Sequence, residues 1–447
     1  MEPNTLLEAA QFIRDGGSSL QLVDRALELA KTKSDLNVFA HLDVVGAREA
    51  ATTLDLEAQS GRVRGPLHGI PITIKDLYNV AGMPTRAGTR APLSQTFQNP
   101  SQDALAVARL RAAGAVILGK VNMHEIALGI TGENVWTGDV KNPLDPSRQA
   151  GGSSSGSAAA VAAGIGFASL GSDTGGSVRI PASFCGCVGF KPSLGLIPLE
   201  GALHLSMTCD HAGPLTRTVA DAHAMTEVLS AQTLPMNLLE SANGLKFGVP
   251  RSWLEGRLGL EVRAGFEALL ERLRLAGATV IDVQPRDLDL TNAAYSPLVR
   301  AEAAFVHRLA LKTQPEGFSL VVRAPLEMGM KVTAIEHLEA LEYRQAVISG
   351  LEEALAGCDA LLVPAAPLPA SKRGTTTVML ESGPQTHRNA YIELTAPFSL
   401  AGLPTLSLPF MLEDGLPVGL QVIGATGADA RVLEIGNWLE SWLAHDQ

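Results

Sequence analysis

The chain has 447 residues, of which 46% are hydrophobic and 4% aromatic, and its formal net charge is −11. The acidic balance and the few aromatic residues argue against a surface for nucleic acid or anionic lipid, because such surfaces need clustered cations or stacking rings. Four cysteines are too few for a disulfide scaffold and fit a reducing compartment. No basic segment followed by an apolar core opens the chain, and its most apolar stretch is broken by glycines, so the sequence predicts a cytoplasmic protein.

The first sixty residues are predicted to be a helical lead-in, with apolar residues at helical spacing over 6–13, 20–30 and 43–58. Ile70, Ile72 and Ile74 then alternate with other residues at the two-residue period of a strand, which ends at Lys75. Further helices are predicted over 103–113, 158–163, 219–229, 262–275 and 428–443, and further strands over 115–118, 165–170, 247–249, 280–283, 361–363, 406–408 and 418–423.

This alternation predicts an α/β fold, with a single large mixed, mostly parallel twisted β-sheet that is covered by helices on both faces. Residues 290–356 are predicted to be largely helical. Residues 371–385 are polar and are predicted to form a mobile loop that covers a pocket.

Two glycine–serine clusters, GGSSSGS at 151–157 and GSDTGGS at 171–177, are joined by a segment of small apolar residues. Such clusters are often linkers, but the adjoining segments 158–163 and 184–190 need burial. Glycine lets bare N–H groups approach a ligand, and serine attacks a carbonyl once a base removes its proton. The two clusters therefore predict the floor of an active site.

Other motifs indicate weaker alternatives. Cys185 and Cys187 have the wrong spacing for a structural zinc pair. Residues 114–121 lack the serine or threonine of a phosphate-binding loop, and residues 164–169 lack the third glycine of a dinucleotide site. Residues 152–156 satisfy G-x-S-x-G, but no buried strand precedes them, so a serine hydrolase with its nucleophile elbow at Ser154 is the weaker alternative.

The second cluster continues as GSDTGGSVRIPASFCG over 171–186 and GFKPS over 189–193, and with the first cluster it closely resembles the amidase signature family. Further likeness lies in GPLHGIP at 65–71 with Lys75, and over 113–123, 210–217 and 401–421. The resemblance implies one amidase domain over 1–447, with a helical lead-in over 1–62, the signature core over 65–215 and a variable substrate-pocket region over 290–390.

The resemblance implies a Ser–Ser–Lys triad, which falls on Ser177 as nucleophile, Ser153 as bridging serine and Lys75 as base. Lys75 serves as a base only when it is neutral, and burial lowers the pKa of a lysine. The family has a cis peptide at the bridging serine, which is expected between Gly152 and Ser153.

The backbone N–H groups of Thr174, Gly175, Gly176 and Ser177 are predicted to form an oxyanion hole. Asp173 and Arg179 are expected to brace this loop rather than react.

By the same resemblance the segment 127–131 lines the pocket. Ala127, Gly129 and Thr131 are therefore predicted to bind substrate, together with Ser154, for which a turn-forming role is the alternative. Ser155 replaces a glycine that is usual in the family, and is expected to tilt the helix start or narrow the pocket.

The implied function is hydrolysis of a small-molecule carboxylic amide to an acid plus ammonia or an amine, through an acyl-enzyme on Ser177. No metal or organic cofactor, nucleic acid or membrane is expected, and a homodimer stays open. The alternative within the family is the glutaminase (A) subunit of a tRNA-dependent amidotransferase complex, against which Ile180 stands where that subunit typically has glutamine. A binding scaffold without catalysis has no positive support, because all three triad positions are filled.

Overall fold

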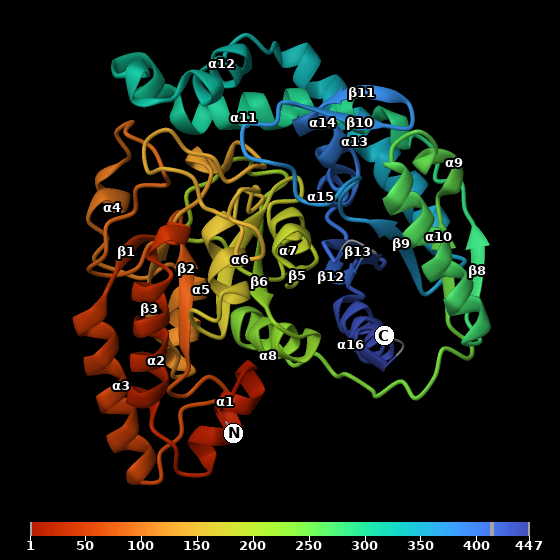
Figure 1. Cartoon of the computed structure of the whole chain (residues 1–447). Coiled ribbons are helices and arrows are strands. Elements are labelled where there is room, and N and C mark those ends of the chain that lie inside the picture. The colour runs from red at the N-terminus through yellow and green to blue at the C-terminus, as the bar shows by residue number, and fades with distance from the viewer. Residues whose placement is uncertain (1, 412–414, 446–447) are drawn as a thin grey trace.

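A large mixed β-sheet runs through the centre of the protein in the computed structural model, which describes residues 2–411 and 415–445 (Figure 1). Its strands in chain order are β1 (Phe39–Leu42), β2 (Pro71–Lys75), β3 (Val116–Val121), β4 (Ala168–Asp173), β5 (Val188–Lys191), β6 (His211–Thr216), β7 (Lys246–Val249), β8 (Thr279–Asp282), β9 (Ala360–Pro364), β12 (Thr405–Met411) and β13 (Pro417–Ile423). β10 (Thr377–Leu380) and β11 (Gly383–Thr386) form a separate hairpin.

The strand order across the sheet is β1-β3-β2-β4-β6-β5-β12-β13-β9-β7-β8. Parallel pairings form two blocks, β3-β2-β4 and β9-β7-β8, and antiparallel pairings join the strands between them. The mixed sheet is confirmed, but its parallel share is smaller than the sequence predicted. The reason is that β12 and β13 form a direct hairpin and β5 and β6 lie side by side, without the crossover helix that a parallel pairing needs.

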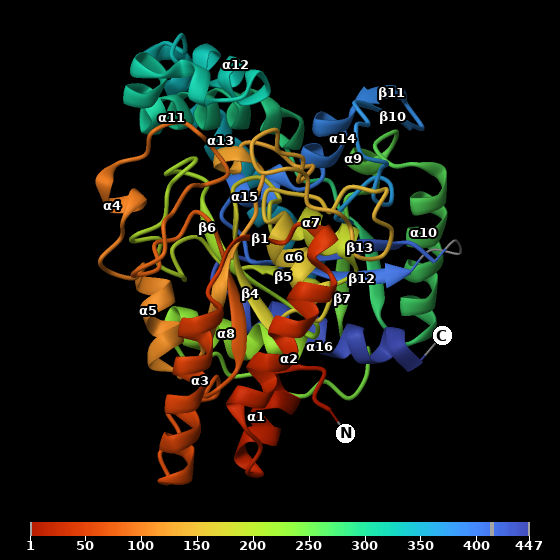
Figure 2. The ribbon, with the colours of Figure 1, turned by 60° about the vertical axis from the view of Figure 1, so that its left-hand side comes forward.

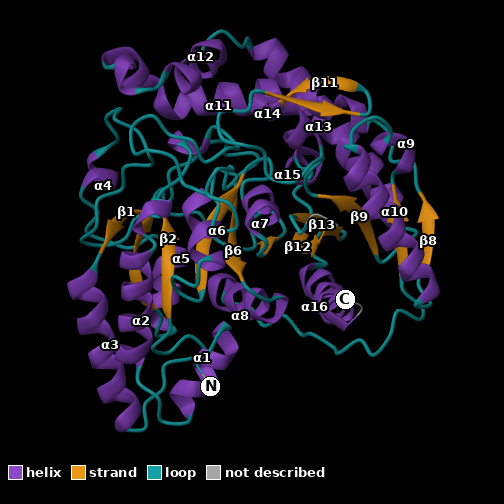
Figure 3. Cartoon of the chain, in the orientation of Figure 1, coloured by secondary structure: helices purple, strands orange, loops and turns teal. Residues whose placement is uncertain are grey.

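Helices cover both faces of the sheet, as predicted (Figure 3). They are α1 (Leu6–Arg14), α2 (Ser19–Thr32), α3 (Val44–Gln59), α4 (Gln95–Gln98), α5 (Leu105–Ala112), α6 (Ser155–Ala162), α7 (Arg179–Cys185), α8 (Val219–Ser230), α9 (Arg251–Leu254), α10 (Leu260–Leu275), α11 (Thr291–Thr313), α12 (Leu320–Gly329), α13 (Ala334–Leu355), α14 (His387–Glu393), α15 (Ala396–Leu400) and α16 (Asp429–His445). Within the described ranges, no helix combines the length and apolarity needed to cross a bilayer.

The alternation along β2 places its two kinds of side chain on opposite faces. Ile72 and Ile74 are fully buried in the cluster that also contains the apolar side chains of α5 and α8. Thr73 points the other way and hydrogen bonds to Ser169. Because side chains alternate along a strand, Lys75 lies on the same face as Thr73, where α6 begins.

The loops at this end of the sheet lie beneath a group of helices. α11, α12 and α13 pack together above the loops that follow β2, in the upper part of the molecule (Figure 2). This confirms the helical prediction for residues 290–356.

Two sequence predictions of local structure need correction. The strand predicted over 165–170 begins later, at Ala168, because Gly164 and Gly166 take left-handed φ values of 78° and 80° and form a turn. Residues 371–385 are not only a loop, since they include the hairpin β10–β11. Val378 and Leu380 are buried on one side of that hairpin, which gives it an apolar anchor.

Gly156 lets α6 pack closely on its neighbours. A Cβ added at this position would lie 2.5 Å from the carbonyl oxygen of Asn122 and 2.8 Å from that of Val38. Both are backbone atoms and cannot rotate away. The small residue therefore fixes the distance between α6, which follows Ser153, and the end of β3.

We predict that Gly156→Ala lowers the free energy of unfolding by about 1–3 kcal/mol, because the backbone clash exceeds the better helix propensity of alanine. Urea unfolding followed by circular dichroism measures the change. Gly357→Ala is the matched control, since a Cβ there meets no atom within 4 Å, and its effect should stay within about 0.5 kcal/mol. Equal stability of the two variants would contradict the prediction.

Candidate active site

The amine of Lys75 lies in the protein interior among serine hydroxyls. Its Nζ atom donates to Ser153 Oγ at 2.7 Å and to the Oγ atoms of Ser154 and Ser172, each at 2.9 Å. The side chain is fully buried, and it forms no ion pair with any described carboxylate. The fold thus brings the strand-end lysine to both glycine–serine clusters.

Burial lowers the pKa of Lys75 to about 7, and the charges of Asp173 and Asp210 only partly oppose this shift. A large fraction of the amine is therefore neutral near neutral pH. Lys120 provides a contrast, because it is also buried but pairs with Asp76 at 2.9 Å. Lys120 thus has a carboxylate partner, whereas the side-chain partners of Lys75 among the described residues are hydroxyls.

Ser153 follows a cis peptide bond between Gly152 and Ser153, as expected. The side chain is fully buried, and its carbonyl oxygen accepts from the backbone N–H of His124 at 3.1 Å. The next residue, Ser154, donates its backbone N–H to the carbonyl oxygen of Ser177 at 3.2 Å. This bond ties the two clusters together directly.

Ser177 lies in the loop after β4, and 6% of its surface is exposed. Among the described residues no hydrogen bond reaches its Oγ atom, so the Ser153–Ser177 bond of the predicted relay is not formed in this structure. The preceding glycines are required by crowding, since a Cβ at Gly175 would collide with the hydroxyl of Tyr295 and one at Gly176 with Thr395.

Asp173 and Arg179 brace this loop as an ion pair that is fully buried. Arg179 Nη2 donates to Asp173 Oδ1 at 2.9 Å and Nε donates to Oδ2 at 3.0 Å. Burial alone would raise the pKa of Asp173, but Arg179 holds it well below its usual range. Arg179 also donates to Ser399 and Gln421, which anchors the loop to the last third of the chain.

The same carboxylate corrects one prediction about the oxyanion hole. Gly176 N donates to Asp173 Oδ1 at 2.8 Å, so this N–H group serves the loop's own bracing and is not free for a substrate oxygen. Thr174, Gly175 and Ser177 remain as predicted backbone donors, and the Thr174 hydroxyl donates to Asp210 at 2.7 Å.

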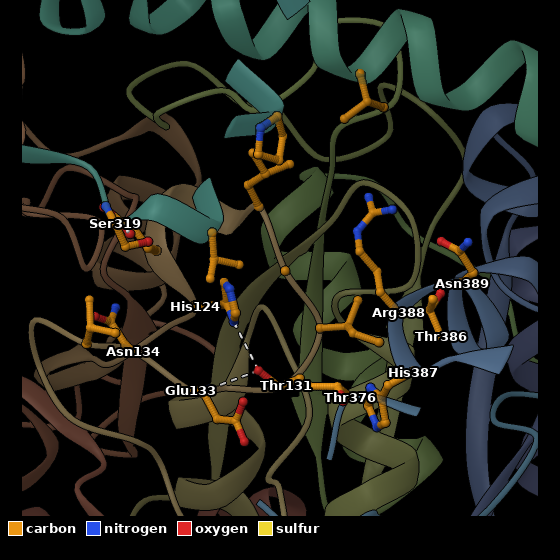
Figure 4. A pocket seen from close by; sticks show the side chains of 18 of the residues that line it. His124, Thr131, Glu133, Asn134, Ser319, Thr376, Thr386, His387, Arg388 and Asn389 are labelled. Atoms are coloured by element: carbon orange, nitrogen blue, oxygen red, sulfur yellow. Dashed lines mark hydrogen bonds between the residues drawn. The ribbon is translucent and has the colours of Figure 1, made fainter. Parts of the chain in front are cut away.

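A cavity of about 630 Å³ opens beside this loop (Figure 4). Its apolar lining includes Leu128, Ile130 and Val299. Its polar lining includes His124, Thr131 and Arg388, together with Thr386 of β11 and Thr376, which precedes β10. The predicted residues Gly129 and Thr131 line it, and Figure 4 shows Thr131 next to His124.

A small recess lies between this cavity and the loop that carries Ser177. The recess is lined by Ser177, Gly175 and the predicted residue Ala127, and it shares further lining residues with the cavity, namely Leu128, Gly129, Ile130, Tyr295 and Arg388. The cavity and the recess that contains Ser177 therefore adjoin each other.

Ser154 does not line the cavity, which contradicts its predicted role in substrate binding. Its side chain is fully buried, and its Oγ atom donates to the carbonyl oxygen of Ser172 at 3.0 Å and accepts from Ser172 N at 3.2 Å. These bonds match the alternative of a turn-forming serine. They also exclude Ser154 as an exposed nucleophile at an elbow.

Ser155 is the buried first residue of α6 and lies against Gly132 rather than in the cavity. The prediction that it narrows the pocket is therefore wrong.

The lining residues that the sequence analysis missed include His124, Tyr295, Arg300 and Arg388. Burial, followed by the charges of Arg388 and Lys75, lowers the pKa of His124 to about 4, so it is neutral at neutral pH. The adjacency of His124 to the 127–131 segment was the available signal. Tyr295 and Arg388 come from the 290–390 region, where no motif marks them.

The comparisons with known proteins agree with this architecture. A family model described as Amidase matches residues 21–433. An amidase of Pseudomonas putida is 35% identical, with 92% of this chain and 90% of that relative covered. The A subunit of the glutamyl-tRNA(Gln) amidotransferase of Anaeromyxobacter sp. (strain K) is also 35% identical, covering 95% and 92%. A solved structure titled "Crystal structure of amidase" has 55% sequence identity and a TM-score of 0.95, covering 98% of this chain and 100% of that one.

The fold and the matched relatives define an enzyme that hydrolyses C–N amide bonds. The chain belongs to the amidase signature family.

We predict that Arg179→Met lowers the free energy of unfolding by about 3–5 kcal/mol, because it leaves the Asp173 carboxylate buried without its cation. Urea unfolding measures the loss. Arg323→Met removes a solvent-exposed ion pair with Glu327 and should cost less than about 1 kcal/mol. A loss at Arg179 as small as that of the control would show that the buried pair is not needed.

Proposed function

We propose that the protein hydrolyses a small-molecule carboxylic amide with Ser177 as nucleophile, Ser153 as proton relay and Lys75 as base. The observation that carries this proposal is the buried Lys75 amine, 2.7 Å from Ser153 Oγ, with a pKa lowered to about 7. A serine hydroxyl is a weak nucleophile and needs such a base through direct or relayed contact.

The hydrogen bonds around Lys75 favour Ser153 as the relay over its neighbours. A neutral amine donates two hydrogen bonds and accepts one. Ser154 already donates its hydroxyl proton to the Ser172 carbonyl, so it can only accept from Lys75. With Ser172 Oγ as the second acceptor, the lone pair of the amine is left for the proton of Ser153.

In the acylation step, the Ser177 oxygen bonds to the amide carbonyl carbon. Its proton passes to Ser153, whose own proton passes to Lys75. The carbonyl oxygen takes the negative charge and is stabilised by the backbone N–H groups of Thr174, Gly175 and Ser177, each worth roughly 3 kcal/mol. The C–N bond then breaks, and the proton returns through Ser153 to the leaving ammonia or amine.

In the deacylation step, a water molecule attacks the Ser177 ester and gives its proton to the same relay. The acid leaves and the serine is restored. Lys75 and Ser153 take up and return one proton in each step, so they supply the acid and base functions of both steps.

The amidotransferase relatives support a second candidate function, which is the release of ammonia from glutamine for a tRNA-dependent amidotransferase. That function shares the same nucleophile and base. The amidase relative from Pseudomonas putida is as similar in identity, so similarity alone does not choose between the two.

We predict that Ser177→Ala and Lys75→Met each lower kcat/KM by at least ~10³-fold, because one loses the attacking oxygen and the other the base. Ammonia release by the purified chain is measured on aliphatic, aryl and amino-acid amides and on glutamine. Ser157→Ala, in the same cluster but with a buried hydroxyl that has no partner among the described residues, is the matched control and should keep its activity. Substantial turnover by either variant would refute the assigned roles, and turnover of glutamine alone that needs an added partner would favour the amidotransferase function.

We predict that kcat/KM rises with pH up to a pKa near 7 and is flat above it. The Lys75 amine accepts a proton only when neutral, and the neutral form predominates above its pKa, so the rate falls about tenfold per pH unit below it. Initial rates on an uncharged amide between pH 5 and 9 measure the profile. A flat profile through pH 6–8 would contradict a lysine base of this pKa.

A further inference from the structure

Two arginines line the cavity without a counter-ion. Arg300 of α11 and Arg388 of α14 both face it, and neither side chain forms an ion pair or hydrogen bond with any residue that the structure describes. Most arginines elsewhere are engaged, for example Arg257, which pairs with both Asp289 and Glu393 beside the neighbouring pocket.

The carboxylates on the cavity wall are already engaged. Glu125 accepts from the Thr89 hydroxyl and the Trp136 indole, and Glu133 accepts from Gly374 N at 2.6 Å. Asp139 pairs with Arg373 at 3.3 Å. These contacts leave Arg300 and Arg388 without an anionic partner in the part of the chain that the structure describes.

The environment of Arg388 disfavours an unpaired charge. Burial lowers the pKa of its guanidinium, and the nearby charge of Arg300 lowers it further, whereas Tyr295 acts in the opposite direction. Placing two cations around a partly buried cavity is unfavourable until an anion joins them. A negatively charged group of a ligand would therefore stabilise the two arginines.

Arg388 also lies close to the reacting serine. It lines the small recess that contains Ser177, together with Tyr295, whose hydroxyl lies over Gly175. Figure 4 shows Arg388, Thr386 and Asn389 on one side of the cavity, opposite Asn134 and Ser319. A substrate group held by Arg388 would thus lie within a few bonds of the scissile carbonyl.

We propose that Arg388, supported by Arg300, binds a carboxylate of the substrate and makes the enzyme select amides that carry this carboxylate near the scissile carbonyl, such as monoamides of short dicarboxylic acids. The inference rests on the proposed function, since it places the substrate against Ser177. A guanidinium recognises a carboxylate through two parallel hydrogen bonds, which fixes orientation as well as charge.

The recess also argues against a zwitterionic amide. Among the described residues that line it, Arg388 is the one charged side chain, and Ile392 occupies the adjoining wall. In glutamine the α-ammonium group is on the carbon that bears the carboxylate, so a carboxylate bound to Arg388 would bring this ammonium group beside a cation, and no carboxylate among the described residues of the recess would offset it. Glutaramate, the monoamide of glutaric acid, should therefore be a better substrate than glutamine, which differs from it only by the α-ammonium group.

The test compares glutaramate with pentanamide, its uncharged counterpart, by initial rates of ammonia release. The wild-type enzyme should show a kcat/KM at least ~10-fold higher for glutaramate. Arg388→Met should reduce this ratio by roughly 10- to 100-fold, the value of a hydrogen-bonded charge, mainly through KM. Arg388→Lys should restore part of the ratio, because it keeps the charge but loses the paired hydrogen bonds.

Arg308→Met is the matched control, since Arg308 lies on the same helix as Arg300 but outside the cavity, stacked on Phe305. It should keep the wild-type ratio. A second measurement is inhibition of pentanamide turnover by glutarate, whose inhibition constant should rise in Arg388→Met.

The proposal is overturned if the wild-type enzyme prefers pentanamide, or if Arg388→Met lowers both rates alike and leaves their ratio unchanged. The second result would assign Arg388 a purely structural role. Failure of the proposed function would give a different result. In that case Ser177→Ala would keep its amide turnover with both charged and uncharged substrates.

Discussion

The buried amine of Lys75, held by three serine hydroxyls and by none of the described carboxylates, is the interaction on which the rest of the structure depends. A carboxylate partner favours the charged form of a lysine, and Lys120 has such a partner in Asp76. Hydroxyls instead satisfy the amine in either protonation state, since each can donate or accept. The alternation of β2 turns this side chain toward α6, and the cis peptide before Ser153 lies where the two meet. The signature sequence thus surrounds one buried nitrogen with hydroxyl partners.

A second, separate set of contacts holds the loop that carries Ser177. Asp173 receives Arg179 and two backbone N–H groups, those of Gly176 and Val178, so the loop is pinned from within. The charge of this carboxylate is balanced by its own cation, and Asp173 opposes the lowering of the Lys75 pKa only in part. The ion pair that braces the Ser177 loop is therefore distinct from the hydroxyls that contact the Lys75 amine, although the two sets of residues are neighbours.

Much of this could be predicted from the sequence, and the failures have physical causes. The strand that ends at Lys75 is visible from its period of two, and the order of the motifs indicates the family. Among three consecutive serines, however, pattern alone does not show which hydroxyl turns toward the lysine and which bonds to the backbone, and Ser154 was misassigned. Tyr295 and Arg388 are far from the signature core in the chain and carry no periodic signal, so only the tertiary structure shows them beside Ser177. The hairpin β10–β11 was missed because each of its strands has only four residues and β11, with the sequence GPQT, is polar and largely exposed.

The contacts of Arg179 have a consequence for how the enzyme is made. Besides Asp173, the guanidinium donates to the carbonyl of Thr395, the hydroxyl of Ser399 and the amide oxygen of Gln421. A nascent chain that has emerged only as far as residue 215 contains the lysine and both serines but none of these acceptors. The loop that carries Ser177 therefore lacks these three hydrogen bonds until the carboxyl-terminal segments have been translated and have packed against it. This loop thus gains its full set of contacts only after synthesis of the chain is complete.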